Sequence, residues 1–265
     1  MAREPRSGPA TTAVQRLGDR RARPRVRWVA RLTGRTPAEV EEALRGIDAH
    51  LDEVEAIHRS HQEGGRSFYA QIRSPFDLYA LTRLLRPTAI VETGVSSGVS
   101  SAHFLLGLQD NRRGRLYSID LPTHQKAAQL ADSESPVSLP PGRSTGWAVP
   151  ARLRRRWDLR LGPSQRLLPA VAEAADPIGL FLHDSLHTPT HLTFELETIR
   201  PHLAPGAVVL ADNTEWTGQA FDRFARTLDV PVIRNGRSDL VGLRVPTDGA
   251  AARGPRRSGR SRATR

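Results

Sequence analysis

The sequence predicts an α/β fold built on a mostly parallel sheet of seven strands, with helices on both faces and a helical extension at the N-terminus. Short apolar runs alternate with helical patterns over residues 75–246, which is typical of parallel strands joined by helices. In addition, the run Ala89–Thr93 enters a glycine turn that opens a helix, and a second run, residues 115–119, ends at Asp120. Sheets with this order of strand, turn and helix bind adenosine-bearing cofactors.

The first helix signals precede the sheet. Thr36, Pro37 and Glu39 form a capping box with proline at the first helical position, and an apolar stripe follows at steps of mostly four and three residues. The stripe consists of Val40, Leu44, Ile47, Leu51, Val54 and Ile57. It must be buried on the sheet domain, on a neighbouring helix or in the seam of a homodimer. We expect residues 36–74 to form the helical extension and a second helix to begin at Pro75.

The remaining elements follow in alternation. We expect strands near residues 88–93, 115–119, 158–161, 178–183, 207–211, 231–234 and 239–244, and helices near residues 97–109, 164–174, 189–203 and 217–228. Residues 122–157 break the rhythm, because Pro, Gly and Ser interrupt them. We expect this interval to be either a lid over the strand ends or a disordered loop.

The two ends of the chain carry its positive charge. Residues 1–35 contain ten Arg against two acidic residues, and residues 249–265 contain six Arg and no acidic residue, so residues 36–248 have a net charge of −3 while the whole chain has +11. We expect a basic, flexible tail over residues 1–35 and an Arg-rich disordered tail over residues 247–265. The tails leave binding to nucleic acid or another anionic surface open, but the body of the chain is not basic.

The composition excludes several classes of protein. The chain has no cysteine, which excludes disulfides, thiolate metal sites and cysteine nucleophiles. The sequence contains no run of about 18 apolar residues, which a membrane span would need. No apolar segment follows the basic N-terminus, as it would in a signal peptide. We therefore expect a cytoplasmic protein, without membrane insertion, whose 265 residues form one sheet domain with appendages.

The spacing of the glycine turn argues against a nicotinamide cofactor. The dinucleotide fingerprint is G-x-G-x-x-G, whose second glycine lets the backbone approach a pyrophosphate, whereas Ser96 stands at that position here. S-adenosylmethionine has no pyrophosphate, so Gly94, Gly98 and Asp120 can meet its methionine end and its ribose. The segment resembles the first two motifs of class I S-adenosylmethionine-dependent methyltransferases. The resemblance implies a Rossmann-like fold and a cofactor-binding role for Glu92, which precedes the turn.

Polar residues follow the fourth and fifth predicted strands. Asp184 ends the run Ile178–His183, and Asp212 and Asn213 follow residues 207–211. Because the carboxyl ends of parallel strands meet at one crevice, these three oxygen-bearing side chains suit Mg²⁺. As alternatives, Asp184 or Asp212 caps the helix that follows it, and Asn213 forms a turn.

Residues 178–213 resemble the metal-dependent O-methyltransferases of the catechol and caffeoyl-CoA type. The string Asp212-Asn-Thr-Glu-Trp216 is close to D-N-T-x-W of the caffeoyl-CoA branch, and Phe181–His187 is nearer still to bacterial methyltransferase family 24. The resemblance implies metal binding by Asp184 and the Asp-Asn pair. It also places Ser164, in the turn after the third strand, beside the adenine of the cofactor.

His187 occupies the position at which the catechol-type enzymes carry a lysine that assists deprotonation of the acceptor. A histidine with a pKa near ~6.5 can accept a proton at neutral pH, so His187 is the candidate catalytic base. As the alternative, His187 is an ordinary polar residue at a helix start. His183 points to the opposite side of its strand from Asp184, and we expect it to be structural.

These observations predict a methyltransferase that transfers a methyl group from S-adenosylmethionine to a hydroxyl of a small-molecule or carbohydrate acceptor, with Mg²⁺ or another divalent metal as a second cofactor. Two other classes stay open. One is a nucleic-acid methyltransferase or binder that uses the Arg-rich tails, although the N-P-P-Y signature of amino-methylating enzymes is absent. The other is a non-catalytic Rossmann-like binding module. Nucleic acid is not the favoured partner.

Overall fold

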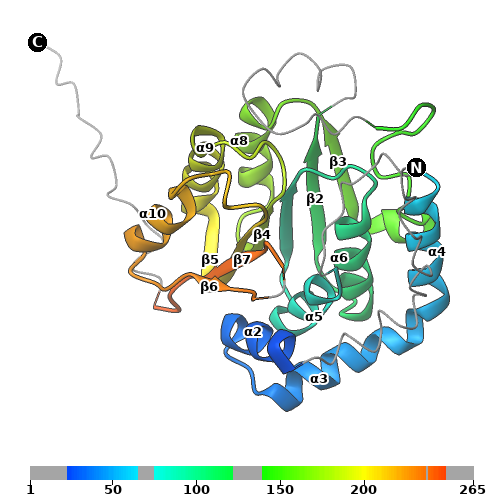
Figure 1. Ribbon diagram of the computed structural model, residues 1–265, viewed down its shortest axis with the longest axis horizontal. Helices are drawn as coiled ribbons and strands as arrows, with labels where there is room; N and C mark the ends of the chain where they lie inside the picture. The colour runs from blue at the N-terminus through cyan, green and yellow to red at the C-terminus, as the bar shows by residue number, and fades with distance from the viewer. Residues whose placement is uncertain (1–22, 65–74, 122–138, 237, 249–265) are drawn as a thin grey trace, which may run out of the picture.

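The computed structural model describes residues 23–64, 75–121, 139–236 and 238–248 of the chain. Its centre is a seven-stranded sheet (Figure 1). The strands are β1 (Ala89–Thr93), β2 (Arg115–Asp120), β3 (Trp157–Leu161), β4 (Ile178–His183), β5 (Leu203–Ala211), β6 (Ile233–Arg234) and β7 (Val241–Arg244).

The sheet has the strand order β3-β2-β1-β4-β5-β7-β6. Strands β3, β2, β1, β4 and β5 are mutually parallel, and β7 is antiparallel to both of its neighbours. The fold class is therefore confirmed. The order reverses between β1 and β4, and open α/β sheets bind their ligands beyond the strand ends at such a switch point.

Helices cover both faces of the sheet (Figure 1). They are α5 (Pro75–Leu85) and α6 (Val99–Asp110) on one face and α8 (Ser164–Ala174), α9 (Pro189–Ile199) and α10 (Ala220–Thr227) on the other. Side chains alternate between the faces along each strand. Ile90 thus packs in the core under α5 and α6, while Val91 packs in the core under α8 and α9.

The N-terminal extension consists of α3 (Pro37–Arg45), a 3₁₀ helix (Gly46–His50) and α4 (Leu51–Gln62). The predicted capping box is present, since Glu39 N donates to Thr36 Oγ1 over 3.3 Å and Thr36 N donates to Glu39 Oε2 over 2.8 Å. The apolar stripe is buried within the chain, in the same core as α5 and α6, except for the partly buried Leu51. This stripe therefore does not supply a dimer seam, and a homodimer through another surface stays a prediction.

A helix that the sequence pattern missed, α2 (Arg23–Thr33), lies inside the segment expected to be a flexible tail. Val26, Val29 and Leu32 are buried, and the Trp28 ring nitrogen donates to the Ile233 carbonyl over 2.9 Å. The expectation of a tail over residues 1–35 is wrong for this stretch. Its apolar residues recur at helical spacing, but the surrounding arginines dominate the composition.

Two further differences concern the boundaries of elements, and a third concerns the predicted lid. Helix α9 ends at Ile199 rather than near residue 203, and β5 begins at Leu203 rather than near residue 207. The described part of the interval 122–157 contains a 3₁₀ helix (Ala151–Arg156). Residues 1–22, residues 65–74 of the predicted helical extension, residues 122–138 of the predicted lid and the C-terminal segment 249–265 lie outside the described residues, so the division into domains stays a prediction. No described helix is long and apolar enough to cross a membrane.

Candidate functional site

Four candidate residues lie in a row just beyond the strand ends. Parallel-sheet hydrogen bonding continues there: Gly162 N donates to Asp120 O, Gly94 N to Ile119 O, Asp184 N to Thr93 O and Asp212 N to His183 O, over 2.8 to 2.9 Å. Adjacent strands lie about 4.8 Å apart. The row Asp120, Gly94, Asp184, Asp212 therefore spans about 14 Å across the switch point, and Asp184 and Asp212 are direct neighbours in it.

The glycine turn is fixed by close backbone approaches. Gly94 has φ +85°, and a Cβ there would lie 1.7 Å from the carbonyl oxygen of Asp184. Gly98 has φ +90°, and a Cβ there would lie 2.6 Å from a methyl carbon of Val149. Both positions thus require glycine. Gly94 in particular lets the turn after β1 rest against the turn after β4.

Glu92 lies fully buried beneath this turn. Its carboxylate accepts hydrogen bonds from Ser100 and Ser101 at the start of α6 and from Ser118 on β2, over 2.5 to 2.7 Å. Burial raises the pKa of Glu92 to about 7, although the three hydroxyls oppose the shift. Glu92 thus ties β1, β2 and α6 together at the base of the site. Its predicted contact with the cofactor stays a prediction.

Asp120 is covered by the described part of the predicted lid. Thr145 donates to Asp120 Oδ2 over 2.9 Å, and Val95 N lies 3.4 Å from Oδ1. Backbone hydrogen bonds from Gly146 N to Ser96 O and from Ala148 N to Ser97 O hold the covering loop on the glycine turn. A ribose that binds Asp120 therefore shares this carboxylate with the Thr145 hydroxyl or displaces it.

Two of the candidate metal ligands, Asp184 and Asp212, are neighbours at the strand ends, and Asn213 follows Asp212 in the chain. Burial, and then the charge of Asp184, raises the pKa of Asp212 to about 7. Asn213 has a left-handed backbone with φ +49°, and His187 Nε2 lies 3.7 Å from Asp184 Oδ1. The part of the chain that the structure describes holds no group of three or more His, Cys, Asp or Glu residues placed to share a metal ion. The site thus offers two carboxylates and one amide oxygen.

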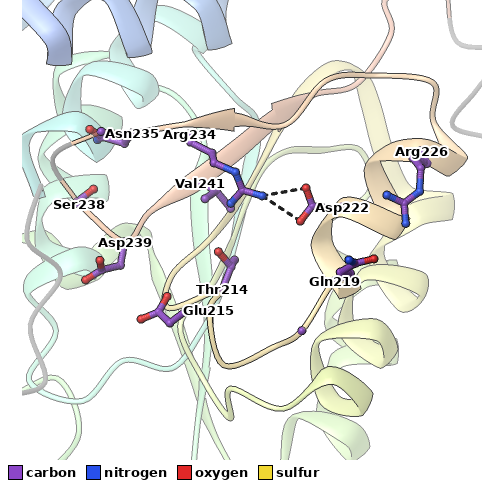
Figure 2. Close-up of a pocket in the computed structure, with 12 residues that line it drawn as sticks. Thr214, Glu215, Gln219, Asp222, Arg226, Arg234, Asn235, Ser238, Asp239 and Val241 are labelled. Carbon is purple, nitrogen blue, oxygen red and sulfur yellow. Dashed lines mark hydrogen bonds and ion pairs between the residues drawn. The ribbon is translucent and has the colours of Figure 1, made fainter.

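An open pocket of about 850 Å³ adjoins this pair (Figure 2). Its described walls are formed by residues between Thr214 and Gly218 after β5, by one face of α10, and by Asn235, Gly236, Ser238 and Asp239 between β6 and β7. Val241, which lines it, pairs with Ala211 across the sheet. The pocket therefore opens at the same edge of the sheet as Asp212.

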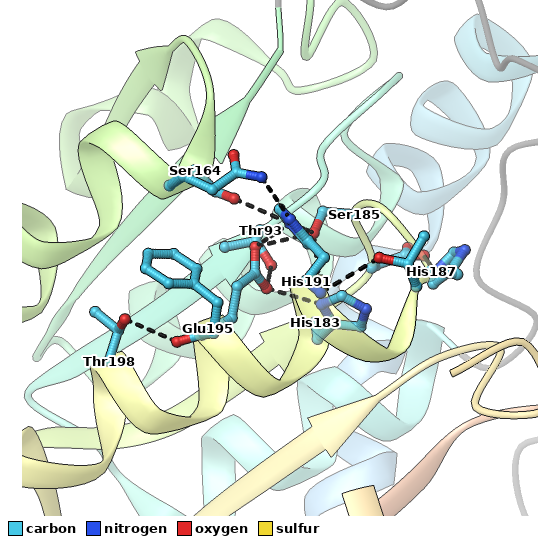
Figure 3. A network of polar contacts seen from close by, with 12 residues as sticks. Thr93, Ser164, His183, Ser185, His187, His191, Glu195 and Thr198 are labelled. Carbon is cyan, nitrogen blue, oxygen red and sulfur yellow. Dashed lines mark hydrogen bonds and ion pairs between the residues drawn. The ribbon is translucent and has the colours of Figure 1, made fainter. Parts of the chain in front are cut away.

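A second polar network, not predicted from the sequence, joins β4 to α9 (Figure 3). Its centre is the fully buried Glu195 of α9, which accepts from His183 Nδ1 over 2.7 Å, from Thr93 over 2.6 Å and from His191 over 2.9 Å. Burial opposes ionisation of Glu195, but the charges and hydrogen bonds of His183 and His191 outweigh it and lower its pKa. His183 is fully buried in this network, and the structural role expected for it stays a prediction.

The network connects the predicted adenine subsite to the turn after β4. His191 Nε2 lies 3.1 Å from the Ser164 hydroxyl and 3.2 Å from that of Ser185, which follows Asp184. Gln165 lies 2.8 Å from the other nitrogen of His191. One sequence signal was available, because Glu195 stands between Leu192 and Leu196 on the buried face of a helix and four residues after a histidine.

Residues 91–214 match the family model described as a methyltransferase domain. The chain carries an S-adenosylmethionine-dependent methyltransferase domain. The match begins in β1 and ends just after Asn213, so it includes every candidate site residue. No curated protein sequence matches the chain.

Solved structures share the fold of this methyltransferase. A Staphylococcus aureus protein provisionally assigned as a caffeoyl-CoA O-methyltransferase has a TM-score of 0.53 and 14% identity, with 76% of this chain and 96% of that chain covered. An S-adenosylhomocysteine-bound Podospora anserina methyltransferase has a TM-score of 0.50 and 17% identity, with 72% and 88% covered. At these identities the likeness is one of fold.

The methyltransferase brings the candidate residues together in two groups. Asp184, Asp212, Asn213 and His187 lie at the ends of β4 and β5, next to Gly94. The second group, Gly98 and Asp120, lies under the loop that Thr145 anchors, while Ser164 reaches the first group only through His191 and Ser185. The individual roles of these residues stay predictions.

Proposed function

We propose that the methyltransferase transfers the methyl group of S-adenosylmethionine to a hydroxyl of a small-molecule or sugar acceptor, with a divalent metal such as Mg²⁺ beside the reacting oxygen. The observation that carries this proposal is the pair of carboxylates after β4 and β5. Burial and mutual repulsion raise the pKa of Asp212 to about 7, and a bound cation would relieve both effects.

The donor set fits Mg²⁺ rather than a softer metal. Asp184, Asp212 and Asn213 offer carboxylate and amide oxygens, and Mg²⁺ in proteins combines one or two carboxylates with several waters. A site with few protein ligands leaves coordination positions for an acceptor. When bound there, the cation would lower the pKa of a coordinated hydroxyl.

The chain's own residues position the reactants and accept the proton. Asp120 would hold the ribose, and the turn from Gly94 to Gly98 would hold the methionine end, so that the methyl group faces the carboxylate pair. S-adenosylmethionine supplies a sulfonium methyl: the acceptor oxygen forms the new O–C bond as the C–S bond breaks, and that electron pair stays on sulfur. The hydroxyl proton passes to His187, beside Asp184. Positioning supplies much of the acceleration.

The metal is tested by chelation. Formation of S-adenosylhomocysteine from a turned-over acceptor should stop in excess EDTA and return with excess Mg²⁺, while binding of S-adenosylhomocysteine, measured by calorimetry, persists. Asp212→Asn, which keeps the shape and removes the charge, should lower activity at limiting Mg²⁺ by about 10- to 100-fold. Asp158→Asn, on β3 and paired with Arg160, is the matched control. Undiminished turnover in excess chelator would reject the metal. It would not make Asp184 and Asp212 helix caps, because the N-caps of α9 and α10 are Thr188 and Gln219.

A further inference from the structure

The pocket beside Asp212 has a lining that is unusual for a small-molecule site. Nine of its twelve described lining residues carry hydrogen-bonding side chains, two are glycines, and of these described residues only Val241 is apolar. Sites for planar, drug-like ligands are lined mostly by apolar and aromatic side chains. A ligand that satisfies this lining must donate and accept hydrogen bonds around most of its surface.

We propose that this pocket binds the methyl acceptor and that the acceptor is polyhydroxylated, a sugar or cyclitol ring rather than a planar phenol. The inference rests on the proposed function, because it needs a methyl donor at the neighbouring strand ends. It deepens that function by naming the substrate class.

Position supports this assignment. The pocket begins at Thr214 and Glu215, directly after Asp212 and Asn213. Its other wall includes Asp239 and Val241, and Val241 pairs across the sheet with Ala211, the residue before Asp212. A ring seated between these walls can therefore place one hydroxyl beside the carboxylate pair while its remaining hydroxyls stay in the pocket.

The geometry of the walls suits neighbouring hydroxyl groups. Figure 2 shows Glu215 and Asp239 on one side of the pocket and Gln219 and Arg226 on the other. Carboxylates accept two or more hydrogen bonds, guanidinium groups only donate, and amides do both. This mixture matches ring hydroxyls, each of which donates and accepts.

The charges of the lining also balance in part. Arg234 Nη2 binds both carboxylate oxygens of Asp222, over 2.9 and 3.1 Å, so this pair closes one wall. Among the described lining residues, the other charged side chains are those of Glu215, Asp239 and Arg226. A neutral polyhydroxylated ring can donate to Glu215 and accept from Arg226.

The acceptor class is tested with the full-length chain, S-adenosylmethionine and Mg²⁺. One probe set consists of methyl glycosides of common hexoses and myo-inositol, and the other of catechol and simple phenols; formation of S-adenosylhomocysteine is measured for each. We expect turnover with a polyhydroxylated probe and none with the phenols. Turnover of catechol or phenol without turnover of any polyhydroxylated probe would overturn the inference while leaving the methyl-transfer function standing.

Gln219→Leu tests the pocket itself. Gln219 is exposed and its side chain makes no capping hydrogen bond to α10, so the substitution removes a pocket amide without disturbing the helix. The KM for the acceptor should rise about tenfold, with kcat and S-adenosylhomocysteine affinity unchanged. Gln62→Leu, an equally exposed change on α4, is the control. An unchanged KM in Gln219→Leu would overturn the assignment of the acceptor to this pocket.

Saturation-transfer NMR with S-adenosylhomocysteine present separates the pocket from the chemistry, because it needs no turnover. We expect signals from the polyhydroxylated probes that weaken in Gln219→Leu and persist in Gln62→Leu. Such binding without methyl transfer would mean that the proposed function fails while the pocket stands. Absence of both binding and turnover for every polyhydroxylated probe would overturn the inference.

Discussion

Three acidic side chains near the strand ends have three different environments. Glu92 is surrounded by hydroxyls, and burial raises its pKa. Burial and the charge of Asp184 raise the pKa of Asp212, whereas two histidines lower the pKa of Glu195. The sequence predicted the position of Asp212, because a carboxylate directly after an apolar strand must lie at the sheet edge. It could not predict the partners of Glu92 or Glu195, since these come from separate elements that only the fold brings together.

The role of His187 can be measured through pH. If it accepts the hydroxyl proton, His187→Ala should lose about 10²- to 10⁴-fold in kcat. The deficit should shrink as pH rises and the hydroxyl ionises without help. His202→Ala, a histidine that precedes the amino end of β5 and pairs with Asp176, should retain wild-type rates. A deficit that stays constant with pH would assign His187 to positioning rather than proton transfer.

Glu92 should give the protein a pH-dependent stability. Its folded pKa of about 7 lies above the ordinary value of 4.5, so between these pH values the folded protein holds a proton that the unfolded chain has lost. The contribution is complete below about pH 4.5 and disappears as pH rises through about 7. Relative to Glu92→Gln, the wild-type free energy of unfolding should thus fall by about 3 kcal/mol across this window.

Urea denaturation of both proteins at several pH values provides the measurement. The comparison removes the contributions of Asp212 and other groups that titrate in both proteins. Above about pH 7 the difference between the two free energies should become constant. A difference that is the same at every pH would mean that Glu92 is ionised in the folded protein despite its burial.

At the level of elements, helices and strands with strong apolar periodicity were predicted well, and segments of mixed composition were not. The strands β1, β2 and β4 and the helices α5, α6 and α8 lie close to their predicted positions, because each has a continuous apolar run or a clear cap. The helix α2 was missed because arginines separate its buried residues. The 3₁₀ segment Gly46–His50 was missed because the apolar stripe runs through it without interruption: Ile47 is buried like its helical neighbours.

The helix α2 should contribute strongly to stability. Trp28 is 3% exposed and bonded to β6, so Trp28→Ala should cost about 3–5 kcal/mol through the cavity it leaves. Trp28→Phe should cost about 1 kcal/mol through the lost hydrogen bond if the ring volume is largely retained. Arg27→Ala on the exposed side of the same helix should have little effect. Thermal unfolding of the three variants provides the measurement, and a neutral Trp28→Ala would place α2 outside the cooperative fold.

At the level of the whole molecule, the alternation of strands and helices predicted a parallel sheet covered on both faces. It did not predict the strand order, since local patterns do not specify which strands become neighbours. Nor did it predict that β7 is antiparallel to β5, which brings the β6–β7 turn and its polar residues beside Asp212. The pocket proposed for the acceptor therefore depends on a contact that no local pattern encodes.

We expect S-adenosylmethionine to bind at the strand ends with its ribose on Asp120. The most direct measurement is calorimetric titration of S-adenosylhomocysteine into wild type, Asp120→Ala and Thr145→Val, with NAD⁺ as the alternative ligand. Thr145→Val removes only the loop hydroxyl that bonds Asp120, so it separates loss of the loop contact from loss of the ribose contact. We predict that wild type binds S-adenosylhomocysteine and not NAD⁺, that Asp120→Ala weakens binding about 10- to 100-fold, and that Thr145→Val does not. Equal affinity of S-adenosylhomocysteine for wild type and Asp120→Ala, or binding of NAD⁺ in its place, would contradict this mode of cofactor binding.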